Sequence, residues 1–494
     1  MTLEKLAKLK SGTDVRGTAS GEQIDLTDEA VSAIVRAFLY VTAARAGREP
    51  LTVAIGHDSR LSAPRISAAA VTAAKESGAN VLFCGLSSTP SMFMLLKEEE
   101  YGADCSIMIT ASHMPSDKNG LKFFWKEGGL QGKEILDILT LASQGKTLSG
   151  AGQVKAIDYM SRYAATLVKK VRASTGKTSP LSGHKIIVDA GNGAGGFYVD
   201  KVLKPLGADT EGSRFLEPDG TFPNHIPNPE NEEAMHSVCE QVVKTGAELG
   251  IIFDTDVDRA AVVDEKGEEI NRNKLIALIS AILLSERSGG IIVTDSVTSD
   301  GLASFIQERG GVHRRFKRGY KNVIDEAKRL NAEGQYSPLA IETSGHAALK
   351  ENYFLDDGAY LVTRILISLA QGKRVRDLIE GLSLPAEEAE VRLPFAEGGD
   401  FKALGEKVLC ELQKKVEHES GLSLAENNFE GVRICFDKQR GNGWALVRMS
   451  LHEPIMPVNF ESNEEGGNRL IAQKLYSLLS DYGFLHIETL KKFC

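Results

Sequence analysis

The chain has 494 residues, of which 42% are hydrophobic and 25% charged, a balance that excludes disordered, collagen-like and low-complexity proteins. At roughly 150 residues per domain, this length suggests about three or four domains. The formal charge of −9 argues against nucleic acid as the main partner, because a phosphate backbone needs a basic face. It is compatible with a small anionic substrate, since a few cations can be focused in a cleft.

The sequence contains no segment that we expect to enter a membrane. Its longest largely apolar stretch, residues 275–284, is well short of the ~18 residues that a spanning helix needs. The first ten residues are too charged for a signal peptide. The six cysteines lie far apart without a C-x-x-C pair, which supports neither a disulfide framework nor a cysteine metal site and fits a reducing compartment. We therefore expect a soluble, cytoplasmic protein.

A short apolar run, a polar loop and a helical segment that stops at a glycine occur three times, over residues 52–78, 185–207 and 290–310. Each repeat is typical of a βα unit in a mostly parallel sheet. The repeats start about 130 and 105 residues apart, which suits successive α/β domains and is too far for a solenoid. From about residue 387, short strands joined by turns and a helix over 468–479 indicate a smaller α+β domain.

The segment 110–122 follows an apolar run and is predicted to be a loop at the carboxyl end of a strand, where open α/β sheets place ligand sites. Ser112 stands beside His113, and Lys122 follows ten residues after the serine. A phosphorylated serine intermediate needs such a hydroxyl nucleophile, proton carrier and positive charge. The alternative is a polar turn that Asn119 and Gly120 close.

Three aspartates, Asp254, Asp256 and Asp258, alternate between two apolar runs. Their carboxylates would repel one another in a tight loop, and a hard divalent cation such as Mg²⁺ resolves that repulsion. An EF-hand is rejected because its sixth loop position holds Arg259 instead of glycine and because the flanks resemble strands. A solvated charged turn is the remaining alternative.

Weaker signals follow other apolar runs. Glu342, Ser344 and His346 on a glycine-containing loop are suited to bind neighbouring sugar hydroxyls, and Arg448 with Ser450 is suited to clamp a phosphate. For each, a surface turn explains the residues equally well. Two further segments have structural alternatives: an N-terminal turn with Arg16, which could face an anion, and the glycine-rich residues 191–196, interpreted as a tight turn.

The order of these motifs resembles that of the α-D-phosphohexomutase family: a serine loop, a triple-aspartate loop, a Glu-x-Ser-Gly-His loop and an Arg-x-Ser loop. The resemblance covers essentially the whole chain, and residues 11–17, 56–60 and 219–229 also resemble family segments. It implies an α/β fold of four domains around one central cleft, with three similar α/β domains and a smaller C-terminal α+β domain. The expected domains are 1–157, 158–268, 269–380 and 381–494.

The resemblance also implies roles for individual residues. Ser112 would be the phosphoserine, His113 its neighbour and Lys122 the general acid or base. Ser112 and the three aspartates would hold Mg²⁺, and Arg259 would contact the transferring phosphoryl group. His346 would take part in the reaction and also bind the sugar. The remaining substrate-binding residues would be Arg16, Tyr320, Lys321, Glu342, Ser344, Arg448, Ser450 and His452.

The implied reaction interconverts hexose 1-phosphates and 6-phosphates of glucose or mannose through a bound 1,6-bisphosphate. Mg²⁺ would be the cofactor, glucose 1,6-bisphosphate the activator, and hexose phosphates the partners of a monomer or dimer. The sequence departs from the family pattern at Met114, Thr343, Leu451 and His452. Because Thr343 stands where other residues mark the hexose subgroups, a phosphoglucosamine mutase is an alternative, as are a sugar phosphatase and a non-catalytic sugar-phosphate binder.

Overall fold

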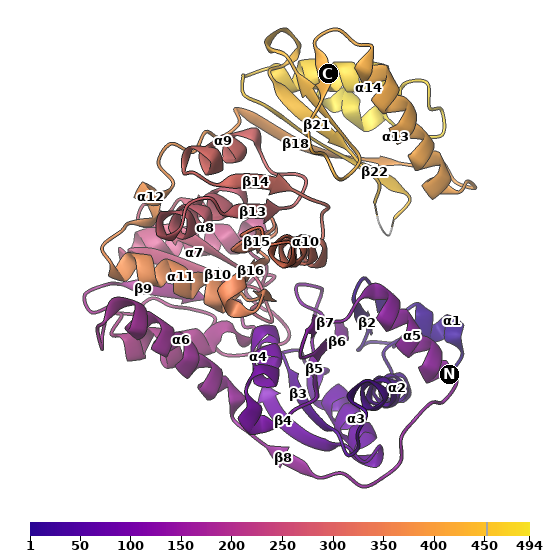
Figure 1. Cartoon of the computed structure of the whole chain (residues 1–494), viewed down its shortest axis with the longest axis vertical. Helices are drawn as coiled ribbons and strands as arrows, with labels where there is room; N and C mark the ends of the chain where they lie inside the picture. The colour runs from indigo at the N-terminus through magenta and orange to yellow at the C-terminus, as the bar shows by residue number, and fades with distance from the viewer. Residues whose placement is uncertain (451–452) are drawn as a thin grey trace. The chain divides into compact units, whose positions relative to one another are not determined.

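The computed structural model describes residues 1–450 and 453–494, and its strands and helices (Figure 1) form two compact units. The first unit comprises Met1–Asn271 and Ser344–Leu378, and the second comprises Arg272–Thr343 and Ile379–Cys494. None of the helices in these described ranges combines the length and apolar character that crossing a membrane requires.

The first unit begins with an eight-stranded mixed sheet. Its central strands run parallel, as the sequence predicted, but β6 is antiparallel to β2, β5 and β7, the three strands that it pairs with. The strands lie in the order β1 (Lys10–Ser11), β2 (Asp14–Thr18), β6 (Lys118–Trp125), β5 (Cys105–Ile109), β3 (Thr52–His57), β4 (Asn80–Leu86) and β8 (Val154–Ala156), with β7 (Gly128–Gly129) beside β6.

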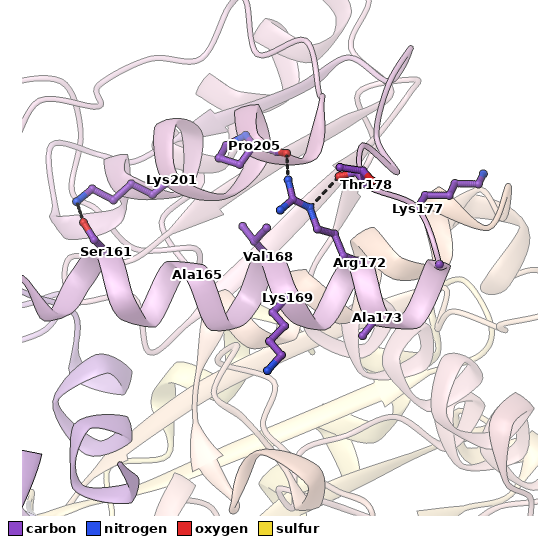
Figure 2. A pocket seen from close by; sticks show the side chains of 11 residues that line it. Ser161, Ala165, Val168, Lys169, Arg172, Ala173, Lys177, Thr178, Lys201 and Pro205 are labelled. Carbon is purple, nitrogen blue, oxygen red and sulfur yellow. Dashed lines mark hydrogen bonds between the residues drawn. The ribbon is translucent and has the colours of Figure 1, made fainter. Parts of the chain in front are cut away.

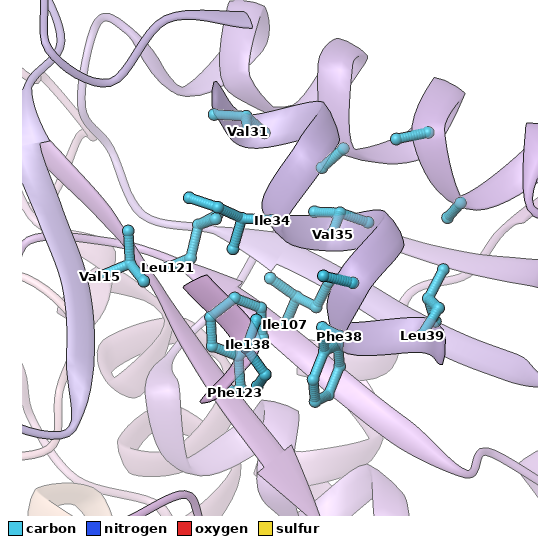
Figure 3. Packing of buried hydrophobic residues seen from close by; sticks show 14 of the residues in the cluster. Val15, Val31, Ile34, Val35, Phe38, Leu39, Ile107, Leu121, Phe123 and Ile138 are labelled. Carbon is cyan, nitrogen blue, oxygen red and sulfur yellow. The ribbon is translucent and has the colours of Figure 1, made fainter. Parts of the chain in front are cut away.

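Helices cover one face of this sheet with a continuous apolar core (Figure 3). In helix α2 (Asp28–Ala46), Val31, Ile34, Val35 and Phe38 recur at helical spacing and are fully buried, as expected for the inner stripe of an amphipathic helix. The side chain of Thr27 caps the start of α2. The helices of this part are α1 (Leu3–Ala7), α2 (Asp28–Ala46), α3 (Ala63–Glu76), α4 (Thr89–Met94) and α5 (Gly132–Ser143).

Strand β6 corrects the prediction of a loop over residues 110–122, because the loop ends at residue 117 and Lys118–Trp125 form a strand. Asn119 and Gly120 are therefore strand residues and do not close a turn. A Cβ on Gly120 would lie 2.3 Å from the carbonyl oxygen of Val15, so the close approach of β2 requires glycine here. Leu121 and Phe123 face the helical core, and strand alternation directs Lys122 to the opposite face.

The remainder of the first unit contains a second mixed sheet, further helices, and the strands β16 and β17, which are not part of that sheet. Its elements are α6 (Tyr159–Thr175), β9 (Ile186–Asp189), α7 (Glu232–Thr245), β10 (Leu249–Phe253), β11 (Ala260–Asp264), β12 (Glu269–Ile270), β16 (Ala347–Leu349), β17 (Leu355–Asp356), α11 (Gly358–Ala370) and α12 (Val375–Leu378). The sheet has the order β12-β11-β10-β9, in which β9 and β10 are parallel and the other pairs antiparallel.

The helical segment expected after β9 is present over residues 194–206 and ends at Gly207, which has φ +92°. Most of it consists of two 3₁₀ turns and one π turn, Ala194–Gly196, Lys204–Leu206 and Val199–Leu203, and Pro205 supplies no amide hydrogen with which to continue an α-helix. A groove of about 650 Å³ separates this segment from α6 (Figure 2). Arg172 and Lys201 bridge the two sides through Pro205 O and Ser161 Oγ, at 2.8 and 2.5 Å.

The second unit confirms the third βα repeat and the C-terminal strands. Strand β13 pairs in parallel with β14 and β15, and the C-terminal part forms an antiparallel sheet in the order β18-β22-β21-β20-β19. The elements are α8 (Arg272–Glu286), β13 (Ile291–Thr294), α9 (Asp300–Glu308), β14 (Val312–Arg315), α10 (Tyr320–Ala332), β15 (Leu339–Ile341), β18 (Glu387–Pro394), α13 (Phe401–Glu417), β19 (Leu422–Leu424), β20 (Val432–Phe436), β21 (Gly443–Val447), β22 (Ile455–Ser462) and α14 (Gly467–Leu479).

Truncation of Phe38 tests the core of the first sheet. Its ring lies 4.6 Å from that of Phe123 and 6.1 Å from that of Trp125, between centroids. We expect Phe38→Ala to lower the free energy of unfolding by about 3–5 kcal/mol, because it removes a buried ring and leaves a cavity. Urea unfolding followed by circular dichroism measures the change. Tyr40→Ala, at an exposed position of α2, is the control, and an equal loss in both variants would contradict this packing.

Candidate active site

The three predicted metal-binding aspartates lie in the tight loop between β10 and β11. Asp254, Asp256 and Asp258 are at most 1% exposed, and each contributes an oxygen to a set whose members all lie within 4.8 Å of one another. Val257 has φ +67°, a left-handed conformation that is costly for a β-branched residue. Such strain persists only where the surroundings hold it, and here the amide of Gly358 donates to Val257 O at 3.1 Å.

Two cations compensate the buried carboxylates. Lys122 Nζ lies 2.9 Å from Asp256 Oδ2 and 2.5 Å from Asp258 Oδ2, and Arg259 Nε lies 3.2 Å from Asp254 Oδ2. Burial by itself would lower the pKa of Lys122, but Asp256 and Asp258 hold it well above its ordinary range. For Asp254, burial and the neighbouring carboxylates raise the pKa well above its usual value. Paired, hydrogen-bonded charges are the form in which buried ions are tolerated.

Ser112 joins this charged cluster from the end of β5. Its hydroxyl donates to Asp254 Oδ2 at 3.1 Å and accepts from Arg259 Nη2 at 3.3 Å. The residue is 2% exposed and has φ +52°, and its amide donates to Thr110 Oγ1 at 2.9 Å. The structure thus brings Ser112, Lys122, Arg259 and the aspartates together although they are far apart in sequence.

Arg60 shapes the serine loop, and sequence reasoning assigned it no role. Its buried guanidinium donates to the carbonyl oxygens of Ser112 and Met114, the latter at 2.7 Å, and to those of Pro115 and Lys118 at 2.6 and 2.8 Å. Asp58 accepts from its Nε at 3.2 Å. The signal was an Asp-x-Arg sequence directly after β3, but nothing in that pattern states that the arginine binds carbonyls of another loop.

The two histidines of the site are held in opposite protonation states. Partial burial and the positive charges of Arg259 and Arg16 lower the pKa of His113 to about 3, although the residue stays exposed at the surface. Burial would also lower the pKa of His346, but the carboxylates of Asp356 and Asp258 raise it to about 9. Asp356 Oδ2 lies 2.5 Å from His346 Nδ1, a partner that the sequence did not reveal. At neutral pH, His346 is the cation and His113 is neutral.

Arg16 belongs to the same unit. It sits on β2, opposite Gly120 of β6, and its Nη2 lies 2.8 Å from Asp14 Oδ2. The charges of Asp14 and Arg16 both act on Lys122, so Arg16 extends the positive side of the cluster. Ser344 is also in this unit, half-buried.

The other predicted sugar- and phosphate-binding residues lie in the second unit. Glu342 accepts from the amide of Gly319 at 2.6 Å, directly before Tyr320, which begins α10. Lys321 pairs with Asp325 at 2.9 Å, so its charge is already partly compensated.

The residues predicted to bind phosphate near the C-terminus, Arg448 and Ser450, also lie in the second unit. Arg448 is 9% exposed, and burial with the nearby Arg318 lowers its pKa. Its Nε has no hydrogen-bond partner among residues 1–450 and 453–494. The hydroxyl of Ser450 accepts from the amide of Glu453 at 3.2 Å. His452 lies outside the described residues.

The acidic loop fits a divalent cation. Asp256 Oδ1 and Asp258 Oδ1 are buried, and neither accepts a hydrogen bond from any residue in the described part of the chain. Buried carboxylate oxygens without a donor are costly, and oxygen ligands at this separation suit Mg²⁺. Thr89 Oγ1 donates to the other oxygen of Asp256 at 2.5 Å and thereby orients the unpaired one.

Comparisons with known proteins match nearly the whole chain. Family models described as phosphoglucomutase/phosphomannomutase, alpha/beta/alpha domains I, II and III, match residues 7–146, 161–267 and 271–384. Phosphoglucomutases from two Neisseria meningitidis strains, of serogroups A and B, are 29% and 30% identical. The alignments cover 94% and 92% of this chain, and 95% and 92% of those proteins. A phosphoglucomutase/phosphomannomutase family structure from Burkholderia thailandensis has 25% identity and a TM-score of 0.82, covering 98% of this chain and 100% of that one.

Replacement of Asp256 tests the metal-binding assignment. Asp256→Asn removes one charged ligand, so we expect at least about tenfold weaker Mg²⁺ binding, since ligand charge sets affinity at oxygen sites. Isothermal titration calorimetry measures this without any substrate. Glu265→Gln, outside the acidic set, is the control, and equal Mg²⁺ affinity in Asp256→Asn and wild type would overturn the assignment.

The histidine pair yields a prediction about pH. Nuclear magnetic resonance of the imidazole rings should show His346 titrating near pH 9 and His113 staying neutral until the pH falls to about 3. Because the folded pKa of His346 lies above its unfolded value, its charge stabilises the fold fully below about pH 6.5. That contribution is lost as pH rises through 9. Titration of both rings near their ordinary pKa would contradict the geometry.

Proposed function

Because this chain belongs to the phosphoglucomutase/phosphomannomutase family, we propose that it is a hexose phosphate mutase. It moves a phosphoryl group between the 1- and 6-hydroxyls of glucose or mannose phosphates, and is therefore an isomerase that acts as an intramolecular phosphotransferase. The observation that carries the proposal is the Ser112 hydroxyl, which contacts both Arg259 and Asp254 inside a buried, charge-compensated cluster.

Ser112 is proposed to carry the phosphoryl group. Arg259 already lies beside the hydroxyl oxygen and has further N–H donors, so it is suited to bind phosphoryl oxygens in a bidentate manner. Lys122 is the proposed proton carrier, and its raised pKa favours its acidic form in the absence of other cations. Transfer of a phosphoryl group depends mainly on positioning and charge neutralisation, and the cluster supplies both.

Asp254, Asp256 and Asp258, with Ser112, are proposed to hold Mg²⁺. When bound, this cation supplies positive charge that stabilises the phosphoryl oxygens during transfer. The unpaired oxygens of Asp256 and Asp258 support the assignment. Thr89 and Lys122, which contact the other carboxylate oxygens, fix the orientation of these ligands.

The proposed cycle has two transfers. Phosphoserine 112 gives its phosphoryl group to the free hydroxyl of a hexose phosphate, whose proton is taken up by a base, and a 1,6-bisphosphate forms. After this intermediate has reoriented, its other phosphoryl group returns to the Ser112 oxygen, and the departing sugar oxygen is protonated. Glucose 1,6-bisphosphate is the proposed activator, because it can phosphorylate Ser112 directly.

Substrate contacts are proposed for both units. The charged Arg16 and His346 favour a phosphate in the first unit, whereas the weakly compensated Arg448 favours one in the second. Glu342 offers acceptor oxygens to sugar hydroxyls. The remaining proposed contacts come from Tyr320, Lys321, Ser344, Ser450 and His452, in a monomeric or dimeric cytoplasmic protein of four domains, 1–157, 158–268, 269–380 and 381–494.

The phosphatase alternative needs an aspartate nucleophile. Asp254, Asp256 and Asp258 are each engaged by Lys122, Arg259 or Thr89, which favours roles as ligands. Release of inorganic phosphate in place of sugar isomerisation would support the phosphatase. Parallel assays on glucose, mannose and glucosamine 1-phosphates, with Mg²⁺ and trace 1,6-bisphosphate, separate the substrate alternatives through kcat/KM.

Replacement of Ser112 tests the proposed function. We expect Ser112→Ala to lower kcat at least about a thousandfold, because the covalent carrier is lost. A coupled assay for hexose 6-phosphate measures the rate. The matched control is Ser116→Ala in the exposed part of the same loop, which should retain wild-type activity. Appreciable mutase activity in Ser112→Ala would contradict the role.

A further inference from the structure

The carboxyl ends of β13 and β15 bring two acidic side chains to one edge of the second unit. The strands are parallel neighbours in which Thr294 pairs with Ile341. The residues that follow, Asp295 and Glu342, therefore leave the sheet side by side. Asp295 is fully buried and Glu342 is 5% exposed. This edge is where α/β sheets place their ligands.

Asp295 holds the residue that follows Glu342. Its Oδ2 accepts from Thr343 Oγ1 at 2.7 Å and from the amide of Thr343 at 3.4 Å. Thr343 is 8% exposed, so its hydroxyl is directed into the protein and is unsuited to contact a sugar. Asp295 Oδ1 is buried without a hydrogen-bond partner within the described residues. This buried carboxyl group therefore depends on the hydrogen bonds that Thr343 donates to its other oxygen.

Glu342 is fixed at its other end by a different loop. Its carboxylate accepts from the amide of Gly319, and Gly319 has φ +113° at the start of α10. The backbone next to Glu342 is therefore held by Asp295, through Thr343. The side chain of Glu342 is held by the amide of Gly319, the residue before Tyr320. Rotation of the Thr343 peptide would move Glu342 and release this loop.

We infer that Asp295 is a positioning residue for substrate binding: it clamps Thr343 and so fixes the Glu342 carboxylate in the orientation that meets the sugar. This inference rests on the proposed function and extends it, because it assigns the unusual Thr343 to the support of the sugar-binding loop. Sugar discrimination in this chain then depends on Glu342 and not on the side chain that follows it.

Thr343→Val tests the clamp, because it keeps the shape of the side chain and removes the hydroxyl donor. We expect KM for the preferred hexose 1-phosphate to rise about fivefold to thirtyfold with a smaller change in kcat, because the lost hydrogen bond to Asp295 weakens substrate binding in the ground state. Thr343→Ser restores the donor and should return KM to within about twofold of wild type. Asp295→Asn retains an acceptor oxygen and should give an intermediate KM.

A matched control separates positioning from general destabilisation. Ser337 lies two residues before the first residue of β15. It is fully buried, and its hydroxyl donates to Ile291 O at 2.8 Å. Ser337→Ala should lower the melting temperature and leave KM unchanged. If Ser337→Ala raises KM as much as Thr343→Val does, the effect is structural and the inference fails.

The remaining outcomes are also decisive. If Thr343→Val folds and keeps the wild-type KM, the proposed role of Asp295 is wrong. If Thr343→Val does not fold, a wild-type KM in Asp295→Asn leads to the same conclusion. A wild-type protein that isomerises none of the hexose phosphates would instead overturn the proposed function. Measuring the wild type in the same assay distinguishes the two failures.

Discussion

The first unit depends on the cancellation of charge around three buried carboxylates. Asp254, Asp256 and Asp258 come from one tight loop, and without Lys122 and Arg259 their burial would cost several kcal/mol per ion. The need to bring these cations to the carboxylates determines where the strand with Lys122 lies. It also determines the strained turn at the aspartates and the position of the serine hydroxyl. The same arrangement of fixed positive and negative groups is what phosphoryl transfer uses. Stability and the proposed chemistry therefore place the same demand on the fold.

Much of this organisation could be predicted from the sequence because it is local. The aspartates alternate after an apolar strand, and the serine loop likewise follows one, so pattern and spacing indicated both candidate segments. The family resemblance then assigned roles to their residues. The predicted loop was wrong beyond residue 117, since the pairing of β6 with β2 is a long-range contact that Asn119 and Gly120 do not reveal. The helical segment expected after β9 is present over residues 194–206 and stops at Gly207 as predicted, but most of it winds as 3₁₀ and π turns.

The supporting residues were beyond the reach of sequence patterns. Arg60 binds carbonyl oxygens, which every residue possesses, so no side-chain motif marks its partners. Asp356 and Asp295 depend on which strands are neighbours, and that register follows only from the folded sheets. These residues determine where the chemically active groups point. In this protein, the sequence motifs indicate the proposed reacting groups, and the tertiary structure identifies the residues that hold them.

The most direct measurement of the central claim is the location of a transferable phosphoryl group. The protein would be incubated with Mg²⁺ and glucose 1,6-bisphosphate, and intact-mass and peptide mass spectrometry would then be recorded before and after addition of excess glucose 1-phosphate. We expect one phosphoryl group per chain, on Ser112, which is lost to the sugar. A phosphoryl group on one of the aspartates, or a phosphorylated Ser112 that no hexose phosphate can discharge, would contradict it.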